Sequence, residues 1–390
     1  HMSHETFETA EKSMAAERTS WLQRRFERLL HEAGIVINGP NPWDPRIHNQ
    51  RALRRMALEG TLGAGEAYVD GDWDCPSLDV LAMRVLGSDL DEHWAVFPEF
   101  SLKRFLEPLV NFQSRAFGAR NVKAHYDLGN ELYKAMLGPT MAYSCGYWRQ
   151  AKTLDDAQSA KHELICRKLA LQPGMRVLDI GCGWGGFAKY AAERYGVRVV
   201  GVTLSAAQAK YAENSCADLP VEIRLQDYRD VRGSFERIVS IGMFEHVGPR
   251  NYRNYFESVR SNLTWDGLFL LHTIGSLRSL RRLDPWMGRH IFPHAVLPSG
   301  SQIQQTSEGL LVLEDWHNLG ADYDKTLMAW HANFVSAWSS LRQRYDERFY
   351  RMWGYYLLTC AGSFRARSSQ LWQIVFSKHG VPGGYVRTGT

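Results

Sequence analysis

The stretch that most constrains the fold is residues 175–186, which read MRVLDIGCGWGG. Its apolar residues predict a buried strand that contains a single carboxylate, Asp179. The strand runs directly into four glycines, which are Gly181, Gly183, Gly185 and Gly186. Glycines let a ligand approach the backbone, and the free N–H groups of a first helical turn would face that ligand. The stretch therefore predicts a slot for an adenosine-bearing cofactor.

The glycine pattern alone also fits a dinucleotide fold or a purely structural turn. A nicotinamide-binding fold carries an acidic residue about 20 positions further on, where it binds the ribose. The next predicted strand, 198–204, has no acid at its end. The early Asp179, the turn at 181–183 and the tail at 203–208 resemble a class I S-adenosylmethionine methyltransferase.

The length and composition of the chain narrow the class of protein to which it can belong. At 390 residues the chain can form two domains. It has no run of 18 apolar residues and no apolar signal core near residue 1, so we expect neither a membrane span nor secretion. Six scattered cysteines without C-x-x-C spacing predict no metal knuckle and no disulfide framework, and indicate a reducing cytoplasm. A net charge of +4 is too small to imply nucleic acid, whereas 13 Trp and 17 Tyr suit an apolar substrate tunnel or an interfacial surface.

The chain divides into two predicted domains. Residues 1–118 indicate a helical N-terminal domain, in which His1 and Met2 resemble a cloning remnant. An amphipathic helix at about 11–34 packs on this domain or contacts a membrane, and a basic linker follows at 115–123. Residues 119–390 alternate strands and helices, which is typical of a parallel α/β sheet, and contain an insertion at 275–309.

The second domain is expected to contain the seven-stranded, mostly parallel sheet of the methyltransferase fold. Strands are predicted at 175–180, 198–204, 221–225, 236–242, 267–273 and 371–376. Helices are predicted at 153–170, behind a capping box at Thr153 and Asp156, and at 322–344 and 347–362.

Ligands of such sheets bind beyond the carboxyl ends of the strands, so the strand ends predict the site. Thr203 and Gln208 follow the second strand. After the third, Asp227 can accept a hydrogen bond from an adenine amino group and Tyr228 can stack on its ring, although a solvated carboxylate is the alternative for Asp227. The fourth and fifth strands end near three ionisable groups, which are Glu245, His246 and His272. Such groups at adjacent strand ends indicate function more than structure.

Six motifs together resemble the cyclopropane fatty acid synthase family over nearly the whole chain. Related mycolic acid cyclopropane synthases resemble only the part from about residue 120 onward. The motifs are HYDLGN at 125–130, YSCGYW at 143–148, VLDIGCGWGG at 177–186, GMFEHVG at 242–248, HTIG at 272–275 and EDWHNLGADY at 314–323.

The resemblance implies methyl transfer from S-adenosylmethionine to a cis double bond of a phospholipid acyl chain, followed by proton loss and ring closure. It implies bound bicarbonate as the base, held by Cys145, Glu245, His272, the backbone of Ile274, and Tyr323. It implies cofactor contacts by Tyr126, Asp179, Gly181, Cys182, Gly183, Trp184, Gly185, Gly186, Thr203, Gln208, Asp227 and Tyr228. It also implies a homodimer.

Other features are compatible with this chemistry. Aromatic faces stabilise a carbocation without trapping it, and the candidates are Tyr147, Trp148, Phe244, Tyr323 and Tyr356, with core packing as the alternative. The insertion carries Arg278, Arg281, Arg282 and Arg289 beside Trp286, Ile291 and Phe292. This set suits docking to the inner face of the cytoplasmic membrane, and a solvated loop is the alternative.

Three other functions remain open at this point. One is a methyltransferase that makes methyl- or methylene-branched fatty acids. A second is a small-amine N-methyltransferase, which would need no bicarbonate. A third is a non-enzymatic lipid-binding protein, which would be expected to lack Glu245, His272 or Tyr323.

Overall fold

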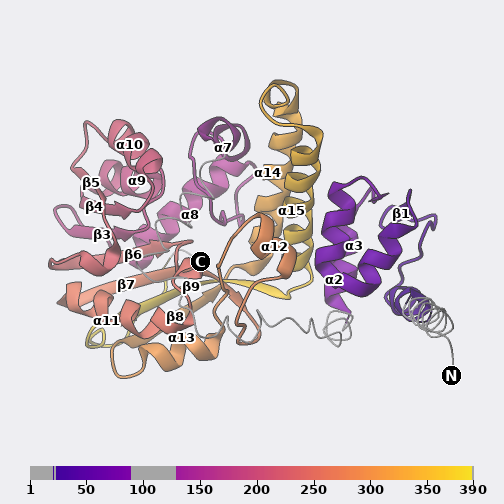
Figure 1. Cartoon of the computed structure of the whole chain (residues 1–390). Coiled ribbons are helices and arrows are strands. Elements are labelled where there is room, and N and C mark those ends of the chain that lie inside the picture. Colours follow the sequence, from indigo (N-terminus) through magenta and orange to yellow (C-terminus); the bar gives the residue numbers. More distant parts are fainter. Residues whose placement is uncertain (1–20, 22, 89–128, 389–390) are drawn as a thin grey trace, which may run out of the picture.

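The computed structural model describes residues 21, 23–88 and 129–388 of the chain (Figure 1). Its centre is a seven-stranded sheet. In sheet order the strands are β5 (Val221–Leu225), β4 (Arg198–Thr203), β3 (Arg176–Ile180), β6 (Phe235–Ile241), β7 (Leu263–Ser276), β9 (Ser369–Ser377) and β8 (Val312–Asn318).

The sheet has the strand directions of a class I methyltransferase fold, which confirms the predicted fold class. The pairs β5–β4, β4–β3, β3–β6 and β6–β7 are parallel, and β9 runs antiparallel to both of its neighbours, β7 and β8. Strand β8 was not among the predicted strands. Its residues Glu314, Asp315, His317 and Asn318 are polar, so no apolar run marks it.

Helices cover both faces of the sheet. On one face, α8 (Leu154–Lys168) and α9 (Gly186–Tyr195) pack on apolar residues of β3, β4, β6, β7 and β9. On the other face, α11 (Tyr252–Asn262) and α13 (Gly300–Ser307) pack on the alternate residues of the strands. The predicted N-cap of α8 is confirmed, because the Thr153 hydroxyl accepts a hydrogen bond from the Asp156 N–H at 3.2 Å.

Short elements connect these layers around the strand ends. They are α10 (Ala206–Ser215) after β4, a 3₁₀ turn at Tyr228–Asp230 after β5, and two 3₁₀ turns at Phe244–His246 and Pro249–Asn251 after β6.

A second group of helices lies beside the sheet (Figure 1). It contains α2 (Arg51–Val69), α3 (Leu78–Gly87), α7 (Asn130–Leu137), α12 (Pro285–His290), α14 (Gly320–Leu341) and α15 (Glu347–Arg365), with a small β1–β2 ladder (Arg46–Ile47 and Trp73–Asp74). Their buried apolar residues form one continuous cluster. The expected domain boundary at 118/119, the basic linker and Tyr126 lie outside the described residues, so the boundary stays a prediction.

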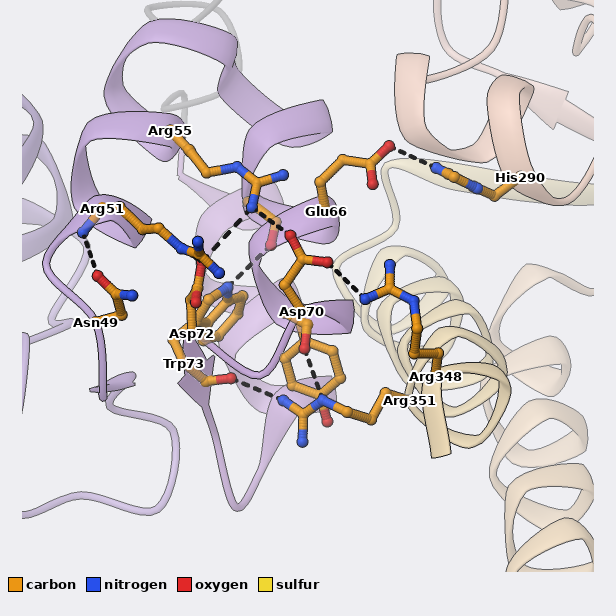
Figure 2. Close-up of polar contacts among 12 residues, drawn as sticks. Asn49, Arg51, Arg55, Glu66, Asp70, Asp72, Trp73, His290, Arg348 and Arg351 are labelled. Atoms are coloured by element: carbon orange, nitrogen blue, oxygen red, sulfur yellow. Dashed lines mark hydrogen bonds and ion pairs between the residues drawn. The ribbon is translucent and has the colours of Figure 1, made fainter. Parts of the chain in front are cut away.

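Charged contacts join the early helix α2 and its following turn to later parts of the chain (Figure 2). Glu66 lies 2.7 Å from the Nε2 atom of His290 in α12, and Arg348 of α15 donates to Asp70 at 2.7 Å. Arg351 donates to the Trp73 carbonyl at 2.9 Å. Helix α2 has a kink at Gly60, where φ is 60°.

The N-terminal amphipathic segment is helical over residues 23–32, and Gly34 lies at a φ of 71°, as expected of a C-cap. Phe26 and Leu30 are buried in the same cluster as α2 and α3. This part of the segment therefore packs on the protein through its apolar face.

Candidate active site

A cavity opens at the carboxyl ends of β3, β4, β5 and β6, where the sequence predicted the cofactor. Its lining includes the predicted cofactor residues Asp179, Gly181, Cys182, Gly183, Trp184, Gly186, Thr203, Gln208, Asp227 and Tyr228. We refer to it below as the cofactor cavity. Tyr126 lies outside the described residues.

Two glycines of the turn have different surroundings. A Cβ atom added to Gly183 would meet no atom within 4 Å, so this glycine, at a φ of 56°, leaves open space at the cavity wall. A Cβ atom on Gly185 would lie 2.9 Å from the Cβ atom of Ala212 in α10. Gly185 is therefore not part of the cavity lining, and its role is to let α10 pack against the turn.

Side-chain caps order the part of the cavity that follows β4 and β5. Ser205 caps α10 by accepting from the Gln208 N–H at 3.2 Å, and the Thr203 hydroxyl donates to the Gln208 amide oxygen at 3.2 Å. Asp227 accepts from the Arg229 N–H at 2.9 Å, which fixes the following turn. Tyr228 is buried and packs edge-on against Tyr255.

The cavity also contains residues that the sequence analysis missed. Lys161 and His162 of α8 line it together with Ser144, and the Lys161 ammonium donates to the Ser144 hydroxyl at 2.7 Å. Burial lowers the pKa of Lys161 and raises the pKa of Asp179, and each charge favours ionisation of the other. Lys161 and His162 lie inside a helix without a motif, so only the packing of α8 on the sheet reveals them.

The residues predicted to hold the base are Cys145, Glu245, His272, Ile274 and Tyr323. Together with Gln373, which contacts His272, we call them the buried polar set. Glu245 lies in the 3₁₀ turn at 244–246, between the cavity-lining residues Met243 and His246. One oxygen of its carboxylate accepts the Ile274 backbone N–H at 2.7 Å, and its Oε2 atom is buried without a hydrogen-bond partner. Burial raises the pKa of Glu245 to about 7.

This geometry corrects the expected role of Ile274. Its N–H was expected to donate to a bound anion, but it donates to Glu245 instead. Ile274 therefore positions the Glu245 carboxylate.

His272 on β7 is held from one side only. Its Nδ1 atom lies 3.2 Å from the Gln373 amide nitrogen, while its Nε2 atom is buried without a partner. Burial, with Lys161 and Lys168 nearby, holds the pKa of His272 well below its ordinary value, so the ring is neutral. Gln373 was not predicted from the sequence.

Cys145 and Tyr323 are both buried. The Cys145 thiol donates to the Gly146 carbonyl at 3.2 Å, and burial raises the pKa of the thiol, which favours its neutral form. Tyr323 stacks on Phe364, and the nearby Cys145 and Glu245 help burial to raise the pKa of its hydroxyl. These electrostatic contacts place Tyr323 near both residues.

The aromatic residues that were predicted to stabilise a carbocation lie in two different parts of the structure. Tyr323 and Tyr356 belong to the cluster of helices beside the sheet, and Tyr147 and Trp148 pack against it. Phe244 belongs to the sheet core, where it stacks on Tyr252 at 4.4 Å. Phe244 is therefore a packing residue.

The insertion at 275–309 is partly core, which corrects its expected character. Trp286 is buried against Gly65 of α2 and Tyr355 of α15, and Ile291 is also buried. Neither can face a membrane. One exposed stretch of the insertion is 277–282, where Leu277 is 69% exposed beside the exposed Arg278, Arg281 and Arg282. Arg289 is exposed as well.

Within 23–88 and 129–388, no helix has the length and apolar composition needed to cross a bilayer. The same part of the chain contains no cluster of His, Cys, Asp or Glu suited to a metal ion.

The sheet order, the glycine turn and the cavity beyond the strand ends define a class I S-adenosylmethionine-dependent methyltransferase. A family model described as mycolic acid cyclopropane synthetase matches residues 113–374. The chain belongs to this family of cyclopropane synthases.

Known relatives agree with this assignment. The cyclopropane-fatty-acyl-phospholipid synthase of Escherichia coli K12 is 53% identical over 356 residues, which cover 91% of this chain and 93% of the relative. The cyclopropane synthase MmaA2 of Mycobacterium tuberculosis has a TM-score of 0.63 and 33% identity, over 67% of this chain and 98% of that one. The mycolic acid cyclopropane synthase CmaA1, solved with SAH and CTAB, has a TM-score of 0.62 and 35% identity, with the same coverage.

Proposed function

We propose that this enzyme converts the cis double bond of an unsaturated phospholipid acyl chain into a cyclopropane ring with S-adenosylmethionine as the donor. The observation that carries the proposal is the pair of partnerless buried atoms in the buried polar set, Glu245 Oε2 and His272 Nε2. Buried polar atoms in proteins normally have partners. Glu245 follows β6, and His272 lies on the neighbouring strand β7. One open carboxylate oxygen and one open ring nitrogen are what a small anion with an O–H group would satisfy.

The reaction imposes two requirements on the protein. An alkene is a weak nucleophile that becomes cationic when it takes a methyl group, so the site must orient it and stabilise positive charge. Aromatic faces stabilise a cation by about 0.5–2 kcal/mol each and add no nucleophilic atom. Tyr323, Tyr356, Tyr147 and Trp148 are the described candidates for this role.

Ring closure then requires a base, because the new methyl group loses one proton. Bicarbonate, when bound, supplies that base. Glu245 would accept its O–H through Oε2, and His272 would donate to it through Nε2. Tyr323 would donate a further hydrogen bond, and Ile274 would hold Glu245 in place. The buried, protonated Cys145 would fill space beside the anion.

The proposed cofactor contacts follow the cavity lining. The glycine turn at 181–186 would approach the methionine part, Gln208 would bind the ribose as an amide, and Asp227 and Tyr228 would bind adenine. Asp179 carries one buried oxygen without a partner, which suits the ammonium group of S-adenosylmethionine. Tyr126, by resemblance to the family, would add a further contact.

The direct test is incubation with S-adenosylmethionine and vesicles of unsaturated phospholipid, with and without bicarbonate, followed by mass analysis of the acyl chains. Gain of one CH₂ with loss of the alkene, and only when bicarbonate is present, is the expected result. A product that keeps a double bond would point to a methylene-branched fatty acid. Methylation of small amines without bicarbonate dependence would contradict the proposal.

We also propose that the enzyme acts as a homodimer on the inner face of the cytoplasmic membrane, with 277–282 against the lipid. An exposed leucine beside arginines suits an anionic surface. The variant Leu277→Ser with Arg281→Gln should bind anionic vesicles roughly ten-fold more weakly. Val386→Ser with Arg198→Gln, which changes exposed residues elsewhere, is the matched control. Equal binding by both variants would rule this surface out.

A further inference from the structure

Three polar side chains form a row across the last three strands of the sheet. His272 on β7 is the register partner of Gln373 on β9, and Gln373 is the register partner of His317 on β8. Register partners on neighbouring strands point to the same face of a sheet. This is the face covered by α8, because Leu270 and Val375 on the same strands pack with Ile165 of that helix.

Helix α8 adds a cation to this row. Lys168, its last residue, is fully buried, and its Nζ atom donates to the Gln373 amide oxygen at 2.7 Å. The same Nζ atom lies 2.8 Å from Nδ1 of His317. Burial lowers the pKa of Lys168 to about 7, and the nearby carboxylate of Asp315 opposes that change.

The Lys168 ammonium decides which way the Gln373 amide faces. In its ammonium form Lys168 has N–H donors and no acceptor, so it favours the orientation in which the amide oxygen faces Nζ and the amide nitrogen faces His272. Gln373 then donates to His272 Nδ1 at 3.2 Å. A neutral imidazole whose Nδ1 atom accepts a hydrogen bond carries its proton on Nε2.

We propose that Lys168 and Gln373 are positioning residues that fix His272 in the tautomer protonated on Nε2. That nitrogen is the buried one without a partner, so the row prepares it as a hydrogen-bond donor. Only the identity of the acceptor, bicarbonate, rests on the proposed function. The tautomer is a property of the protein alone.

The test is the ¹⁵N spectrum of the histidine rings of the full chain without ligands, with the His272 signals assigned from their loss in His272→Asn. The wild-type protein should carry the proton on Nε2. In Gln373→Glu the carboxylate can only accept, so the proton should move to Nδ1. The control is Gln370→Met, which changes a buried amide on the same strand that bonds to Asn318 and the Arg367 carbonyl. It should leave His272 as in the wild type.

Turnover gives a second readout. Gln373→Glu should lower turnover roughly 10- to 100-fold, as loss of partners that orient a ligating histidine does. Gln373→Met should raise the bicarbonate concentration for half-maximal turnover and leave the S-adenosylmethionine Kd unchanged. A purely structural role would instead lower both affinities or the melting temperature.

Two results would overturn the inference: a wild-type His272 protonated on Nδ1, or a tautomer that Gln373→Glu does not change. The proposed function fails by a different measurement, namely if the turnover of the wild-type enzyme does not depend on the bicarbonate concentration. That outcome would leave the tautomer measurement valid.

Discussion

The cofactor cavity and the buried polar set lie at the same edge of the sheet but are built differently. The cavity is assembled largely from loops that directly follow β3, β4 and β5, and its glycine turn supplies backbone groups. The buried polar set draws its residues from segments far apart along the chain, two of them from β7. Hydrogen bonds join Glu245 to the Ile274 backbone N–H and Gln373 to His272. The cavity thus depends on local backbone shape, whereas the buried polar set depends on strand register.

The difference teaches that binding and chemistry can be altered separately. Cavity residues can change cofactor affinity without affecting Glu245 or His272, because no hydrogen bond described here joins the glycine turn to either side chain. Residues of the buried polar set should alter proton transfer while cofactor affinity stays constant. The substitutions described next test whether cofactor binding and proton transfer can be changed independently of each other.

The largest effect is expected for Glu245→Gln. The amide can still accept from the Ile274 N–H, but its second atom becomes a donor and can no longer accept a proton-bearing group. Turnover should fall about 100- to 10,000-fold, the range for loss of an acid–base group. Product analysis gives turnover, and calorimetry should show S-adenosylmethionine affinity within two-fold of the wild type.

Glu257→Gln is the matched control, because the Glu257 side chain is 52% exposed and pairs with a surface arginine, Arg253. It should keep wild-type turnover. A large loss of cofactor affinity in Glu245→Gln would show that the two parts of the site are not separable.

A smaller effect is expected in the pH dependence of stability. Burial raises the folded pKa of Glu245 to about 7, while the unfolded carboxyl titrates near its ordinary value of about 4.3. Between these values the folded state holds a proton that the unfolded state releases, so the free energy of unfolding falls as pH rises. Glu245→Gln removes this contribution.

The stability of Glu245→Gln relative to the wild type should therefore rise by up to about 3 kcal/mol between pH 4.5 and 8. Urea unfolding at several pH values measures it. If the free energies of unfolding of Glu245→Gln and the wild type change equally with pH, then the Glu245 carboxyl is not held in a desolvated site.

The smallest effects concern the two glycines of the turn. Gly183→Ala would place a methyl group in the open cavity, and should raise the Kd for S-adenosylmethionine roughly ten-fold. Gly185→Ala would place it against Ala212, and should cost about 1–3 kcal/mol of stability with cofactor affinity kept. Calorimetry measures the Kd for S-adenosylmethionine, and urea unfolding measures the stability.

Gly174→Ala is the control for backbone strain alone, because Gly174 also has a positive φ and its Cβ would meet no atom. It should lower stability by about 1 kcal/mol. If Gly183→Ala and Gly185→Ala have equal Kd values for S-adenosylmethionine, then the two glycines do not have separate roles in cofactor binding and in packing of α10.

The sequence predicted most of what is continuous along the chain. The first strand and its turn, the strands at 198–203 and 221–225, and the cap at Thr153 follow from local patterns and are present in the structure. Strand β8 was missed because most of its residues are polar. Trp286 was assigned to a membrane surface because a Trp beside arginines has the same pattern whether it is buried or exposed.

For the site, the sequence predicted the glycine turn that borders the cavity. Through the resemblance to the family it also proposed Glu245, His272 and Tyr323, whose roles stay predictions. Local periodicity and a glycine turn need only neighbouring residues, so they can be read from the chain. Only the tertiary structure decided that Ile274 holds Glu245, and that Lys168 acts on His272 through Gln373. These contacts join residues up to 205 positions apart, and they exist because β9 enters the sheet between β7 and β8 in one register.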